Sequence, residues 1–106
     1  MKLKEFMDKF ICPNSLVRLL KKLDDGHGYI MLTPEAVMDW EITGLSEKII
    51  SCEVVHITDV FCETYREAIN IVINTDLSSN DIKKELESFR ERCEMERTSY
   101  IEGGLT

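Results

Sequence analysis

The stretch AINIVINT, residues 68–75, carries the clearest strand pattern in the chain. Isoleucine occupies every second position, at Ile69, Ile71 and Ile73, and two asparagines and a valine fall between and after them. Because successive side chains of a β-strand point to opposite faces of a sheet, this period of two predicts a strand with one apolar face. The chain is therefore expected to contain a sheet, with these three isoleucines in its core.

Three other stretches have the composition of strands. Val, Ile, Thr and Phe dominate SCEVVHITDVFC at 51–62, and shorter apolar runs occur in GYIMLT at 28–33 and AVMDWEI at 36–42. Such residues are enriched in strands because they pack well on a pleated surface. The pattern adds four side chains to the expected core: Met38, Trp40, Val55 and Ile57.

The stretch SLVRLLKKL, residues 15–23, supports two interpretations. Leu16, Leu19, Leu20 and Leu23 recur at the spacing of a helical face. The DDGHG that follows has the composition of a hairpin loop and leads into GYIMLT, which favours two paired strands. Periodicity favours a helix and turn chemistry favours a strand, so these residues alone leave both open.

Helices are predicted at both ends of the chain. Leu3, Phe6, Met7 and Phe10 form one helical face, and Pro13 follows as a helix breaker. Near the other end, residues 76–81 offer several N-cap side chains for a helix from about 80 to 101. One stripe of this second helix recurs at alternating steps of four and three residues: Ile82, Leu86, Phe89, Cys93, Glu96 and Tyr100.

The expected fold is α+β. It consists of a short N-terminal helix, about five mostly antiparallel strands forming a curved sheet or small barrel, and a long C-terminal helix. With 106 residues the chain is expected to be a single domain, 1–106. Within it, residues 1–76 would form the helix and β core, and residues 77–106 the C-terminal helix and tail.

No sequence motif points to catalysis or to a cofactor. The chain has no P-loop, no GxSxG, no GxGxxG and no CxxC pair. We therefore expect no catalytic residue, no metal site and no cofactor. The N-terminal MKLKEFMDKF is too charged for a signal peptide, and no apolar run approaches the length that crosses a bilayer. These features predict a cytoplasmic protein without membrane contact.

Charge is distributed unevenly along the chain, which has a net charge of −7. Residues 24–81, the acidic segment, contain twelve Asp and Glu against Lys48 and Arg66 alone, a net charge of −10. Such a segment repels nucleic-acid phosphates and attracts a basic protein surface. Direct nucleic-acid binding is therefore not expected. The ordinary alternative to a binding surface for a basic protein is that these acids form a solvated polar face of the sheet. The predicted partner-binding residues are Asp39, Glu41, Glu53, Asp59 and Glu63.

The C-terminal helix raises a separate possibility of self-association. Its four-three spacing is the period of a coiled coil, over only about two and a half heptads. In the simpler interpretation Ile82, Leu86 and Phe89 pack on the protein's own sheet. In the other, the distal part forms a homodimer. The predicted oligomerisation residues are Cys93, Glu96 and Tyr100.

Three segments together resemble a known group of proteins: CPNSLVRLL at 12–20, VMDWEI at 37–42 and EVVHITDVFCETYREAINIVINT at 53–75. They are similar to small phage and prophage proteins of Firmicutes and gut communities, over roughly residues 3 to 75. No activity is attached to that group, so no functional residue is transferred. The resemblance implies a strand at residues 15–23 and a mobile-element origin.

Two functions are expected from these observations. The first is a non-catalytic acidic binding protein that blocks a host or bacterial protein with a basic nucleic-acid-binding surface, for example as an anti-defence, anti-CRISPR-like inhibitor. The alternative is an oligomeric module that self-assembles through the C-terminal helix, with a small-ligand pocket between subunits.

Overall fold

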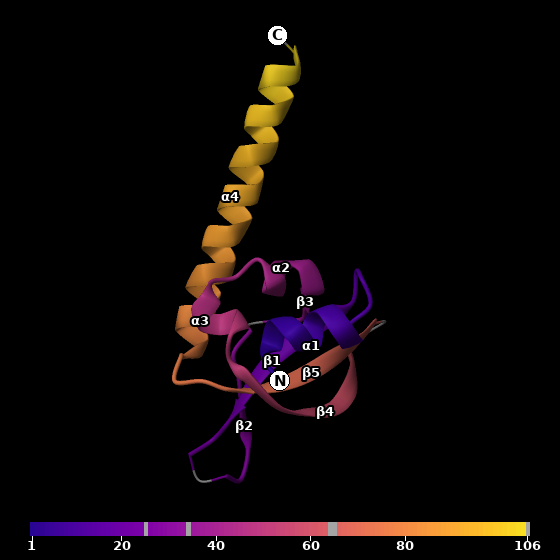
Figure 1. Cartoon of the computed structure of the whole chain (residues 1–106), viewed down its shortest axis with the longest axis vertical. Helices are drawn as coiled ribbons and strands as arrows, with labels where there is room; N and C mark the ends of the chain where they lie inside the picture. The colour runs from indigo at the N-terminus through magenta and orange to yellow at the C-terminus, as the bar shows by residue number, and fades with distance from the viewer. Residues whose placement is uncertain (25, 34, 64–65, 106) are drawn as a thin grey trace.

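A computed structural model gives the fold of the chain. It describes the backbone of residues 1–105 except 25, 34 and 64–65, and the side chains of residues 1–58 and 68–96 except 25 and 34. The elements in chain order are α1 (Leu3–Phe10), β1 (Leu16–Lys22), β2 (Tyr29–Met31), β3 (Val37–Met38), α2 (Asp39–Thr43), α3 (Glu47–Ile50), β4 (Glu53–Glu63), β5 (Arg66–Asn74) and α4 (Ser79–Leu105). The expected α+β class, with a helix at each end of a five-stranded sheet, is confirmed (Figure 1).

The sheet is open and mixed. Its strands lie in the order β2-β1-β5-β4, and β3 pairs with the beginning of β1. Strands β1 and β5 are parallel, in register from Leu16 opposite Ala68 to Leu20 opposite Val72. The other three pairings are antiparallel, as expected for most of the sheet. The small barrel is therefore not formed.

A contact between distant strands indicates that the sheet is curved. The hydroxyl of Tyr29 on β2 lies 2.8 Å from Nε2 of His56 on β4, although β1 and β5 separate these two strands. Three strand spacings would place their backbones about 14 Å apart in a flat sheet. Twisting and curvature of the sheet bring these two side chains within reach of each other.

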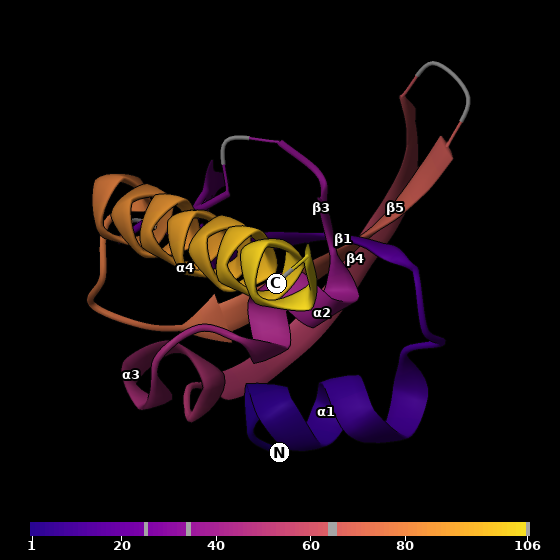
Figure 2. The same cartoon turned by 90° about the horizontal axis from the view of Figure 1, so that it is seen from above.

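The core lies between one face of the sheet and the helices. Helices α1, α2 and α3 and the first turns of α4 lie on this face (Figure 2). Ile71 and Ile73 are fully buried, as predicted, while Ile69 is partly buried. The buried apolar side chains that meet them come from nearly every element: Leu3, Met7, Val17, Leu19, Leu32, Val37, Ile42, Leu45, Ile49, Ile50, Ile82 and Leu86.

Residues 15–23 form a strand, which decides between the two interpretations of their sequence. Val17, Arg18 and Leu19 on β1 are all buried, although they alternate between the two faces of the sheet. Strand β1 has β5 on one side and β2 and β3 on the other. A central strand covered on both faces has a nearly continuous apolar sequence, which explains why its leucines imitate a helical spacing.

Four predictions about the core were wrong or only partly right. Val55 and Ile57 are 44% and 48% exposed, because β4 is the last strand of the sheet. Trp40 is 48% exposed and Met38 is half-buried. The predicted strand at 36–42 is also wrong beyond Met38, because residues from Asp39 form helix α2.

Helix α4 begins at a capping box. The hydroxyl of Ser78 accepts a hydrogen bond from the amide of Asp81 at 3.2 Å, and the Asp81 carboxylate accepts one from the amide of Ser78 at 2.9 Å. Ile82 and Leu86 are then buried against the core, but every described side chain from Arg90 to Glu96 is exposed. The distal part of α4 therefore projects from the body of the protein (Figure 1).

Candidate functional site

The two predicted acids in VMDWEI are both used inside the fold. Asp39 lies in the first turn of α2, where its carboxylate accepts a hydrogen bond from the amide of Ser15 at 3.1 Å. The amide of Asp39 in turn donates to the carbonyl of Ser15 at 2.9 Å. This pair of bonds joins the start of β1 to the end of β3, so Asp39 has a structural role here.

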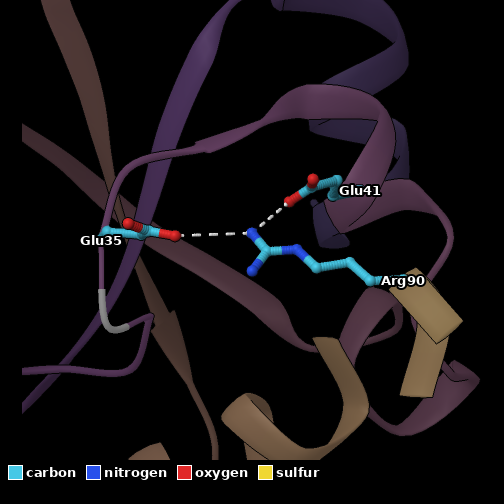
Figure 3. Close-up of polar contacts among 3 residues, drawn as sticks. All are labelled: Glu35, Glu41 and Arg90. Atoms are coloured by element: carbon cyan, nitrogen blue, oxygen red, sulfur yellow. Dashed lines mark hydrogen bonds and ion pairs between the residues drawn. The ribbon is translucent and has the colours of Figure 1, made fainter. Parts of the chain in front are cut away.

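Glu41 is buried and paired with Arg90 of α4. Its side chain is 12% exposed, and its carboxylate accepts a hydrogen bond from Nη2 of Arg90 at 2.9 Å. Glu35 lies 3.7 Å from the same nitrogen, so the guanidinium stands between two carboxylates (Figure 3). The hydrogen bond from Arg90 to Glu41 raises the pKa of Arg90 above its ordinary value. These contacts join α2 and the segment before β3 to α4.

The other three predicted partner-binding acids all belong to β4. Glu53 is exposed at the beginning of this strand, and its carboxylate lies 2.9 Å from the N-terminal ammonium of Met1. That hydrogen bond lowers the pKa of Glu53 below its ordinary value of 4.5. The side chains of Asp59 and Glu63 lie outside the described residues, although their backbone is part of β4. The five predicted partner-binding acids are thus divided between two elements. Asp39 and Glu41 on α2 make contacts inside the fold, and the other three belong to β4, the last strand of the sheet.

Strand β4 combines acidic and apolar residues at the end of the sheet. Its sequence, EVVHITDVFCE, contains three acids and no Lys or Arg. Val55 and Ile57, which the sequence pattern assigns to the core, are instead about half exposed on it. Two irregularities in the pairing of β4 with β5 lie between Val54 and His56 and between Thr58 and Phe61.

The predicted oligomerisation residues lie on the projecting part of α4. Cys93 and Glu96 are exposed, and Tyr100 has a side chain outside the described residues. Beside Cys93, an open pocket of about 340 Å³ is lined by Trp40, Phe89, Arg90, Cys93 and Glu94. The rings of Trp40 and Phe89 are 6.3 Å apart between centroids. An aromatic surface therefore lies where α4 leaves the body.

Sequence reasoning missed the contacts that hold α4 in place. Gly44 lies so close to the ring of Phe89 that a Cβ atom there would clash with it. Ser46 donates two hydrogen bonds to the carboxylate of Glu85, from its amide at 3.0 Å and from its hydroxyl at 2.9 Å. Arg90 and Glu41 are separated by 49 residues. No local pattern indicates such pairs, because each joins segments far apart in sequence.

The described residues contain neither a cluster of metal ligands nor a helix suited to a membrane. Among the described residues, no three His, Cys, Asp or Glu side chains are grouped as metal ligands would be. In the same part of the chain, no helix combines the length and the apolar character needed to span a bilayer. Comparisons with protein-family models, curated proteins and solved structures found no significant match.

Proposed function

We propose that this chain is a non-catalytic acidic binding protein of mobile-element origin. It blocks the basic nucleic-acid-binding surface of a host or bacterial protein in the cytoplasm, as an anti-defence, anti-CRISPR-like inhibitor does. The observation that carries the proposal is the charge of the acidic segment, twelve acids against two bases, together with the concentration of three of these acids on one edge strand. A basic groove built for phosphates also attracts carboxylates presented along a strand.

The test is a binding experiment with an activity readout. The purified chain is immobilised, incubated with nuclease-treated bacterial lysate at low and at high salt, and the captured proteins are identified. We expect a basic nucleic-acid-binding protein that is released by salt and by added nucleic acid. The purified partner should lose its nucleic-acid binding or cleavage when the chain is added. Capture without any loss of that activity would contradict the proposal.

Charge reversal on β4 tests whether inhibition of the partner depends on the acidic residues of this strand. The variant Glu53→Lys, Asp59→Lys, Glu63→Lys should abolish inhibition. A matched control carries three reversals at exposed acids elsewhere, Asp8→Lys, Glu87→Lys and Glu91→Lys. It has the same net charge and should remain inhibitory, since its β4 is unchanged. Equal loss in both variants would mean that total charge alone, and no defined surface, is responsible.

A second candidate function, self-assembly through α4, is favoured by the exposed aromatic pocket at its base. In a dimer, Cys93 and Met95 on the projecting helix of a second copy would be the apolar side chains available to Trp40 and Phe89. The test is the mass in solution of the full chain and of a chain that ends after Arg92, which keeps the buried residues Ile82 and Leu86. A dimer that becomes a monomer on truncation supports this function, and a monomeric full chain at high concentration excludes it.

A further inference from the structure

Strand β4 presents an open edge along most of its length. It is the last strand of the sheet and pairs with β5 on one side. On its other side, within the described residues, only its first residues have a backbone partner. An edge of this length offers unpaired amide and carbonyl groups to another extended chain. Natural edges are commonly protected by Lys, and β4 contains none.

The beginning of this edge already holds an extended segment of the chain. Lys2 forms an antiparallel bridge with Glu53, and the amide of Val54 donates to the carbonyl of Met1 at 2.9 Å. The N-terminal ammonium lies 2.9 Å from the Glu53 carboxylate. At Leu3 the chain turns into α1. Two residues with positive charge are thus paired with the beginning of the edge, by backbone contacts and by the ion pair between the ammonium and Glu53.

The residues after this bridge define what a longer strand must provide. Val55 and Ile57 are 44% and 48% exposed, so apolar surface is available on the strand. The sequence of β4 adds Asp59 and Glu63 to Glu53, with no basic residue to balance them. An added strand is therefore favoured if it carries Lys or Arg together with apolar residues, because opposite charges across paired strands are stabilising.

We propose that the edge of β4 from Val55 to Glu63 binds an extended, basic segment of the partner as an additional strand of the sheet. The inference rests on the proposed function, since it specifies how the basic partner is bound. A second copy of this chain is a poorer occupant. Antiparallel pairing of two such edges about the midpoint of Val55–Glu63 would place Asp59 opposite Asp59 of the other copy, and like charges in that position are destabilising.

A pair of synthetic peptides separates strand addition from simple attraction of charge. The first alternates Lys and Val. The second has the same length and charge but carries proline in place of its central valine, which removes a backbone donor and interrupts a strand. We expect the first peptide to bind at least about tenfold more tightly in fluorescence anisotropy, because several backbone hydrogen bonds are lost in the second. Amides of β4 should gain protection from hydrogen exchange only with the first. Equal affinities would overturn the proposal.

Variants of the strand test the location. Val55→Lys with Ile57→Lys adds two positive charges to the edge and should abolish binding of the alternating peptide. The control Glu87→Lys changes the net charge by the same amount on exposed α4 and should bind almost as well as the unchanged chain. Circular dichroism establishes that both variants are folded. Loss of binding in the control alone, or in both equally, would overturn the proposed location. The proposal would also be overturned if the unchanged chain were a dimer and the Val55→Lys, Ile57→Lys variant were a monomer.

The outcomes also distinguish this inference from the proposed function. If the Val55→Lys, Ile57→Lys variant still captures and inhibits a basic nucleic-acid-binding protein, the proposed function stands and strand addition fails. If the alternating peptide binds β4 but no such protein is inhibited, strand addition stands and the inhibitory function fails.

Discussion

The contact between Gly44 and Phe89 determines how closely the segment after α2 approaches α4. Gly44 has φ −84° and ψ −4°, a conformation open to any residue, so space and not backbone freedom requires glycine. We expect Gly44→Ala to lower the free energy of unfolding by about 1–3 kcal/mol, since an added methyl group overlaps the ring. Urea denaturation measures this. Phe89→Leu should reduce the cost of Gly44→Ala in the double variant, and additive effects would contradict the contact.

Arg90 provides a second prediction for a single residue. Arg90→Gln leaves the Glu41 carboxylate, 12% exposed, without its charged partner. Because the Arg90 side chain is 43% exposed, solvent offsets part of the loss, and we expect about 1–2 kcal/mol of destabilisation in thermal or urea unfolding. The control Lys83→Gln removes a charge from an exposed position of the same helix and should change stability by less than about 0.5 kcal/mol. Similar losses in both would show that Glu41 does not depend on Arg90.

Local sequence patterns predict the burial of a residue correctly when its burial depends only on the helix or strand to which it belongs. Ile71 and Ile73 alternate on a strand covered by helices, and both are buried. Val55 and Ile57 have the same alternation but lie on an edge strand. Which strand is at the edge depends on pairing between distant segments, and this is absent from the local sequence. For the same reason, the internal role of Glu41 could not be predicted.

At the scale of elements, the start of α4 depends on the Ser78–Asp81 capping box. Hydrogen bonds from the Ser78 amide and hydroxyl lower the pKa of Asp81 below its ordinary value of 3.8. A depressed pKa means that the ionised carboxylate contributes stability above pH 3.8, and that this contribution is lost as the pH falls through the lower, folded-state pKa.

The measurement is an NMR titration of the Asp81 carboxyl group. We expect its midpoint below pH 3.8 in the unchanged chain and closer to 3.8 in Ser78→Ala, which removes the hydroxyl donor. The same variant should fray the first turn of α4, visible as faster amide exchange near Ile82. An unchanged midpoint in Ser78→Ala would mean that the hydroxyl contributes nothing to the cap.

The prediction for AVMDWEI failed at the level of the element. The five alternating residues from Met38 to Ile42 fit a strand, but one turn of helix buries Ile42 equally well and leaves Trp40 beside Phe89. Helix α2 forms because Asp39 bonds back to Ser15 and Glu41 meets Arg90. For β5 and the two end helices, longer patterns predicted the correct element. A pattern that extends over more residues is less easily compatible with both a strand and a helix.

At the scale of the whole molecule, the projecting helix makes the protein elongated. The Cα radius of gyration is 15.2 Å, against about 13 Å for a compact chain of this length. A chain ending after Arg92 should have a smaller radius in X-ray scattering and nearly the same melting temperature, because it keeps Ile82, Leu86 and Phe89. A chain ending after Asn80 loses all three and should not fold. A large drop in melting temperature on the shorter deletion would mean that the distal helix packs on the body.

The parallel pairing of β1 with β5 has a consequence for synthesis. Residues 16–20 acquire their central neighbours only when residues 68–72 are available, so the middle of the sheet closes across about half the chain. A ribosome must therefore extrude β5 before β1 is covered on both sides, while β4 and β5 can meet as a local hairpin. Until then the run LVRLL lacks its parallel neighbour β5. The middle of the sheet is thus completed late, because β1 meets its central neighbour only after β5 has been synthesised.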